Sequence, residues 1–124
     1  MRTTDSPERV SFLTVEEGDD LILAFALEGA DPEDIISLIL MRTPQFEGLV
    51  PEEERGVSVS HEALPEQEGE RLRRIRLETP ITEIVSNLHL YSLDVTRVDA
   101  EELAAAERVL KRMNFDSRFD LERD

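Results

Sequence analysis

The chain has 124 residues but no cysteine, no tryptophan, one tyrosine and a single lysine. Without cysteine it can form neither disulfides nor thiolate metal sites, a composition that fits the cytoplasm. The first nine residues, MRTTDSPER, are polar and lack the apolar core of a signal peptide. Acidic residues interrupt every long apolar run before it reaches the ~20 residues that a membrane-spanning helix needs. The sequence therefore predicts a cytoplasmic protein with no membrane association.

Sequence motifs that carry chemistry are also missing. The chain contains no glycine-rich phosphate loop, no nucleophile elbow, and no HExxH or other paired metal-ligand spacing. These absences predict a protein without a cofactor or a bound metal, and they lean against catalysis. Nucleic acid is excluded as a general partner, because a net charge of -15 repels phosphate backbones.

The acidity itself has two explanations that the sequence leaves open. The 29 acidic residues outnumber the 14 basic ones, and acid-rich, lysine-poor surfaces are typical of proteins that work at high salt, while a GC-rich genome favours arginine over lysine. The alternative explanation is a specific basic partner protein.

Four acids gather at Glu16, Glu17, Asp19 and Asp20, but they lack the spacing and the trailing Glu of a calcium loop, so we interpret them as a solvated turn.

The strongest strand pattern lies in LILAFAL, residues 21–27. Alternate residues of a strand point to opposite faces, so both faces of this one are apolar and both need to be covered. The next apolar run, residues 35–41, is ambiguous, because Asp31 and Pro32 are good residues for starting a helix. Periodicity alone does not separate a short buried strand from a helix. We favour a helical turn at Pro32–Ile35 followed by a strand at Ile36–Thr43.

Alternating apolar residues and intervening turn residues predict further strands. They span residues 10–16, 56–61, 71–78 and 88–98, and residues 81–87 are interpreted as a helical turn. The most regular element is a helix at Asp99–Met113, where Asp99 and Glu102 form a variant of the capping box before an apolar stripe. Residues 115–124 are expected to form a short, loosely packed extension.

These elements predict an α+β fold: a mainly antiparallel, curled sheet of five or six strands, with one C-terminal helix packed on it. Residues 1–9 are expected to be a disordered tail, and residues 10–124 a single α+β domain. One helix covers only one face of a sheet. The other face must be covered by the sheet curling over itself or by a second copy of the chain.

The candidate binding residues begin with the two histidines, His61 and His89, which lie on apolar sides of their strands. If those strands were neighbours, the imidazoles could combine with Glu62, Tyr91 or Asp94 in a small metal or acid-base site. The bland alternative is that each histidine is a hydrogen-bonded structural residue. We name His61, His89, Tyr91 and Asp94 as candidate binding residues and no residue as catalytic.

The other candidates form the one basic patch in the chain. The patch occupies a single predicted strand and consists of Arg71, Arg73, Arg74 and Arg76. It is a candidate site for a phosphate or an acidic partner. Alternatively, the arginines protect an edge strand against aggregation and pair with nearby acids.

Small size and the lack of motifs favour one class of function. We expect a non-catalytic protein-interaction module that self-associates, with a homo-oligomer or another protein as its partner. Two alternatives remain: a small-molecule binding or carrier domain, and an enzyme with an unfamiliar site. An exposed apolar sheet face would indicate the interaction module, and an enclosed apolar cavity would indicate the binding or carrier domain. Convergence of His61 and His89 with a carboxylate would indicate the enzyme.

Overall fold

The computed structural model describes residues 7–29, 33–64 and 69–123. Within these ranges the chain forms eight strands, two short 3-10 helices and one α-helix. Their bounds are β1 Glu8–Glu17, β2 Leu21–Glu28, β3 Ile35–Arg42, η1 Pro44–Leu49, η2 Glu52–Glu54, β4 Ser58–His61, β5 Leu72–Leu77, β6 Ile81–Ser86, β7 Leu90–Asp94, α1 Ala100–Met113 and β8 Asp120–Arg123.

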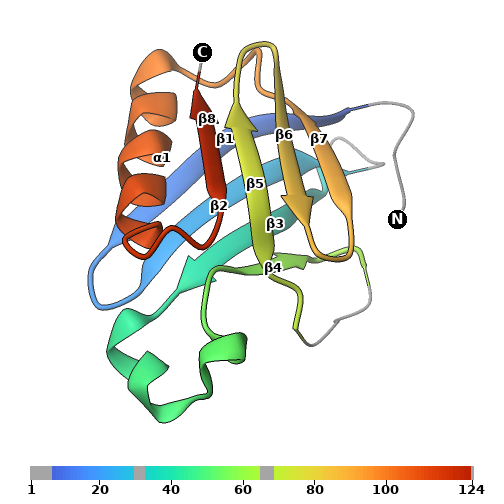
Figure 1. Cartoon of the computed structure of the whole chain (residues 1–124). Helices are drawn as coiled ribbons and strands as arrows, with labels where there is room; N and C mark the ends of the chain where they lie inside the picture. Colours follow the sequence, from blue (N-terminus) through green and yellow to red (C-terminus); the bar gives the residue numbers. More distant parts are fainter. Residues whose placement is uncertain (1–6, 30–32, 65–68, 124) are drawn as a thin grey trace.

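The strands form one mixed sheet in the order β4-β3-β2-β1-β7-β6-β5-β8. Most neighbours are antiparallel, but β1 runs parallel to β7 and β5 runs parallel to β8. The sheet curls until β4 meets β5, where Ser58 and Arg71 form a bridge and the Leu72 N–H donates to the Val57 carbonyl oxygen. Figure 1 shows two layers, with β1–β3 behind β5–β7 and α1 to one side, next to β8.

The predicted fold class is therefore wrong in both strand number and strand direction. The sheet has eight strands rather than five or six, and it contains two parallel pairs. β6 occupies residues expected to form a helical turn, because polar Thr82 and Ser86 point inward with Ile84 and blur the alternation. β8 lies in the expected loose extension, and its charged sequence becomes a strand only by pairing with β5.

The ambiguous segment after β2 is a strand. β3 pairs with β2 without a break from Ile35, opposite Glu28, to Arg42, opposite Leu21. The strand interpretation of this run is confirmed. The expected helical turn at Pro32–Ile35 is wrong at its end, because Ile35 already belongs to β3, and Pro32 lies outside the described residues. β1 begins at Glu8, inside the segment expected to be a tail, of which residues 1–6 also lie outside the description.

The core lies between the two layers and under the helix. The odd-numbered residues of β2 point inward, and Leu23, Phe25 and Leu27 have no exposed surface. On α1, Ala106, Val109 and Leu110 are equally buried. The predicted helix is thus confirmed, and Asp99 is its N-cap residue, but the predicted capping hydrogen bond is absent because the Asp99 side chain makes none. No helix in the described part of the chain is long and apolar enough to cross a membrane.

Candidate functional site

Both predicted histidines belong to polar clusters at the inner face of the curled sheet. His61, at the end of β4, accepts a hydrogen bond at Nδ1 from the Ala63 N–H over 3.1 Å. A ring nitrogen that accepts carries no proton, so the neutral imidazole has its proton on Nε2. Nε2 lies 3.0 Å from a carboxylate oxygen of Glu8 on β1 and donates to it. Both nitrogens of His61 are therefore occupied.

The second group, the Glu70 cluster, consists of Glu70, Ser86, His89 and Tyr91. The buried Glu70 Oε2 accepts from the Tyr91 hydroxyl over 2.6 Å and from the Ser86 hydroxyl over 2.8 Å. His89 Nδ1 lies 3.2 Å from the same oxygen. Ser86 Oγ also accepts from the N–H groups of residues 88 and 89, so the cluster braces the β6–β7 turn.

The structure brings three of the predicted site residues together. The His61 ring stacks on the Tyr91 ring with centroids 5.8 Å apart and an angle of 11°, and the His89 ring lies 5.6 Å from Tyr91 on a tilt. Their strands β4 and β7 are not neighbours in the sheet; the residues meet because the sheet curls. Since His61 has no free ring nitrogen, the group supports the structural interpretation of this histidine rather than a joint metal or acid-base site.

Asp94 is not part of this group. It lies at the end of β7, where its Oδ1 accepts from the Thr96 hydroxyl over 2.6 Å and from the Thr96 N–H over 3.0 Å. These hydrogen bonds lower the pKa of the Asp94 carboxyl below its usual value. Asp94 therefore shapes the turn that follows β7.

The four arginines of the basic patch do not converge on one site. Arg71 donates to the backbone carbonyl oxygens of Glu54 and Glu70, and so ties β5 to the segment before β4. Arg76 forms an ion pair with Glu78 over 3.0 Å, and Arg73 and Arg74 are exposed. The arrangement favours separate structural contacts over a phosphate site.

The acidic turn between β1 and β2 is engaged with its neighbours. Glu17 pairs with Arg108 on α1 over 3.0 Å, and Asp20 accepts from the Thr43 hydroxyl over 2.7 Å. Among the described residues, no three acidic or histidine side chains are grouped so that they could hold a metal ion. A shallow hollow of about 240 Å³ lies beside the turn, and its lining residues are Gly18, Asp19, Leu21, Pro44, Gln45 and Arg112.

The two outer faces of the curled sheet differ in charge. On the outer face of β5–β8, cross-strand rows bring charged residues together, such as Arg76 between Glu83 and Glu122. Arg74 lies opposite Asp120 on the same face. A face of this kind stays hydrated and is typical of an ordinary solvent-exposed sheet surface.

The outer face of β1–β4, here called the uncharged face, is different. Its outward-pointing residues in the central rows are Phe12, Thr14, Ile22, Ala24, Ala26, Ser37, Ile39, Met41, Ser58 and Ser60. Among the described residues, charged side chains lie at the margins of this face, including Glu16, Glu28 and Glu62, whose Oε1 accepts from the Ser37 N–H. Phe12 is 43% exposed and Met41 is 40% exposed. In Figure 1, α1 and β5–β7 lie on the same side of β1–β3, which leaves this face uncovered by any described element.

Several residues of the clusters were not identified from the sequence. The sequence patterns place Glu70 among the acids near the arginine patch, Ser86 in a helical turn and Glu8 in the tail. The alternation of strand residues could have identified Glu70 and Ser86. Glu70 continues the inward-pointing row of Leu72, and Ser86 continues the inward-pointing row of Ile84. For Glu8 no local signal exists, because its contact with His61 joins distant parts of the chain.

Comparisons with protein-family models, with curated proteins and with solved structures found no match. The function of the chain must therefore be inferred from the geometry of the described residues.

The Glu70 cluster leads to a prediction about Tyr91. Burial raises the pKa of its phenol, and the hydrogen bond to Glu70 and the charges of Glu70 and Glu8 raise it further. The folded pKa exceeds the unfolded value of about 10, so the stabilisation is complete below pH ~10 and is lost as the pH rises. We expect phenolate absorbance to appear only above that pH, together with unfolding.

Phenolate absorbance reports on Tyr91 alone, because the chain has one tyrosine and no tryptophan. Near-ultraviolet absorbance and circular dichroism are followed during an alkaline titration. Glu70→Gln removes the adjacent charge and should move the titration to lower pH, whereas the control Glu83→Gln, on the outer face, should not. A phenol that ionises near pH ~10 in the folded wild-type protein would contradict the prediction.

Proposed function

We propose that this protein is a non-catalytic interaction module that self-associates through the uncharged face. The observation that carries the proposal is an uncovered sheet surface with apolar and small residues in a chain of net charge -15. Exposed apolar patches rimmed by polar residues commonly mark protein interaction sites. Pairing an uncharged surface with itself buries no carboxylate, which makes a second copy of the chain the fitting partner.

The size of the surface sets the expected affinity. Four strands spaced ~4.8 Å apart, with an average of about seven residues at ~3.3 Å per residue, cover roughly 400 Å². That is small beside the ~800 Å² per partner of a standard stable interface. We therefore expect a dimer that forms at micromolar or higher concentration.

The two alternative functions have less support. The hollow beside the acidic turn, about 240 Å³, is below the ~300–1,000 Å³ of usual ligand pockets. The group formed by His61, His89 and Tyr91 has a polar, enzyme-like composition, but both ring nitrogens of His61 are occupied by hydrogen bonds. Neither feature favours a carrier or a catalyst over the interaction module.

Sedimentation equilibrium over a range of micromolar concentrations tests the proposal. Ile39 lies in the middle of the uncharged face, between Ala24 and Ser60. Ile39→Glu places a carboxylate at the centre of the interface and should give a monomer at every concentration. The wild-type protein should show a mass that rises with concentration.

The matched control is Val85→Glu. It adds the same charge on the other outer face, where Val85 lies opposite Arg74, so association should continue as in the wild type. A wild-type protein that stays monomeric throughout the range, or an Ile39→Glu variant that still dimerises, would refute the proposal.

A further inference from the structure

A second group of exposed apolar side chains lies between β3 and β4 and in the loop after α1. Here the lobe means η1 and η2 (residues 44–55) together with the loop after α1 (residues 114–118). Neither 3-10 helix buries a single residue. Of the seven large apolar side chains exposed in the described part of the chain, four belong to the lobe: Phe46, Leu49, Val50 and Phe115. Leu49 is the extreme case, with 83% of its surface exposed.

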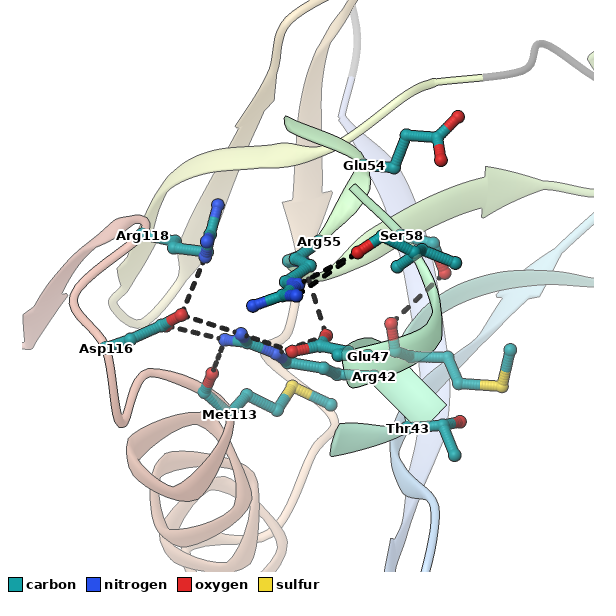
Figure 2. Close-up of polar contacts among 12 residues, drawn as sticks. Arg42, Thr43, Glu47, Glu54, Arg55, Ser58, Met113, Asp116 and Arg118 are labelled. Atoms are coloured by element: carbon teal, nitrogen blue, oxygen red, sulfur yellow. Dashed lines mark hydrogen bonds and ion pairs between the residues drawn. The ribbon is translucent and has the colours of Figure 1, made fainter. Parts of the chain in front are cut away.

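The lobe is nevertheless fixed to the domain by a buried cation. Arg42, at the end of β3, has a side chain with no exposed surface. Its guanidinium donates to both carboxylate oxygens of Glu47 and both of Asp116, each over 2.8 Å, and to the Met113 carbonyl oxygen over 2.7 Å. Figure 2 shows Arg42 between Glu47 of η1 and Asp116 of the loop after α1. The Phe115 ring lies 4.2 Å from the guanidinium carbon.

Two further arginines connect the parts of the lobe to one another. Arg118 forms an ion pair with Asp116 over 2.6 Å (Figure 2). It also donates to the Glu52 carbonyl oxygen over 3.1 Å. Arg55 donates to the Val50 carbonyl oxygen. Desolvating a guanidinium costs stability, yet here it orders a segment that adds nothing to the core. The lobe is therefore a surface held in one conformation before any partner arrives, which lowers the entropic cost of binding.

The charge of the lobe limits what can bind to it. Its arginines are engaged within the lobe, and Arg118 also forms an ion pair with the Glu52 carboxylate over 3.7 Å. The neighbouring Glu53 and Glu54 are exposed and follow the apolar residues of η1 in the sequence. A second copy of the chain would bring these carboxylates against each other. A partner with basic residues around an apolar stripe would instead pair with them while covering Leu49 and Phe46.

We propose that the lobe docks a basic amphipathic segment of another protein, with leucine-type side chains against the apolar residues and Lys or Arg against Glu53 and Glu54. The occupant is a helix or extended peptide of this composition, one of the recurring modes of peptide recognition. The lobe and the uncharged face share no residue.

The test uses a synthetic amphipathic helix of leucine and lysine as the probe, and a peptide of the same pattern with glutamine in place of lysine. Binding to the full-length protein is measured by fluorescence anisotropy. Leu49→Ser and Phe46→Ser should each weaken binding of the leucine-lysine peptide about tenfold or more, as expected for central interface residues. Val85→Ser, a change on the outer face of β6 away from both surfaces, is the control and should leave binding unchanged.

A second pair of variants separates local charge from total charge. Glu53→Gln combined with Glu54→Gln should weaken binding and reduce its dependence on salt. Glu101→Gln combined with Glu102→Gln removes the same charge from the start of α1 and should have a much smaller effect. Equal losses from the two pairs would mean that only net charge attracts the peptide, and would overturn the proposal.

Other results would also overturn it. These are no binding of the leucine-lysine peptide, equal binding of the glutamine peptide, or equal binding by Leu49→Ser and the wild type. Binding to phosphatidylcholine vesicles that is lost in Leu49→Ser would assign the lobe to a lipid surface instead. Because the lobe variants leave the uncharged face intact, their effect on peptide binding is independent of self-association.

Discussion

Replacing Arg42 by Met is expected to reduce the free energy of unfolding by about 3–5 kcal/mol, the usual cost of removing one partner from a buried ion pair. The value should lie toward the low end, because the side chains of Glu47 and Asp116 are 15% and 30% exposed and can be partly hydrated. Arg108→Met is the control. Arg108 pairs with Glu17 at the surface, and its loss should cost less than about 1 kcal/mol.

The same substitution should change how stability depends on pH. The hydrogen bonds from Arg42 lower the pKa of Asp116. Partial burial raises the pKa of Glu47, but hydrogen bonds from Arg42 and the Gly56 N–H outweigh it, so the net shift is downward. Carboxyls with lowered folded pKa values stabilise the protein above their unfolded values of about 4, and this stabilisation is lost as the pH falls.

Urea unfolding of the wild type and Arg42→Met at about pH 7 and about pH 3 tests both statements. The difference in unfolding free energy should be large at neutral pH and shrink in acid. A difference that is small at neutral pH would show that Arg42 does not anchor the lobe. A large difference that persists unchanged in acid would show that its ion pairs are not the cause.

Replacing Phe25 by Ala is expected to cost about 3–5 kcal/mol, since the ring has no exposed surface and its removal leaves a cavity in the core. The matched variant is Phe12→Ala on the neighbouring strand, where the ring points outward and is 43% exposed. It should cost less than about 1 kcal/mol when measured at a concentration too low for self-association. Equal costs would mean that β1 and β2 are not oriented as described.

The local parts of this fold could be predicted from the sequence, because their cause is local. The alternation in residues 21–27 predicted strand β2 and its two apolar faces, and the capping and stripe residues predicted the position of α1. The parallel pairs could not be predicted, since the pairing of Glu8 with Leu93 leaves no mark on either segment alone. β8 is a strand only because β5 lies next to it.

The candidate sites divide in the same way. Alternation correctly placed His61 on the buried side of its strand, but the curl of the sheet decides that it meets Tyr91. Arg42 falls on the inward row of Leu38 and Leu40, which is a readable sign of a buried charge at a strand end. Its partner Asp116 lies on a distant loop, and no pattern around either residue links them.

The position of β1 between β2 and β7 also governs the order in which the protein can be assembled during translation. β1, β2 and β3 are consecutive and pair with near neighbours, so this meander can form as soon as residue 42 has left the ribosome. Its inner row is not fully covered until α1 has been made, about 70 residues later, which takes roughly 4–14 s at ~5–20 residues per second. During that interval both faces of β2 are apolar and open to water. A nascent chain in this state is the form most exposed to aggregation, and the form that a chaperone would bind.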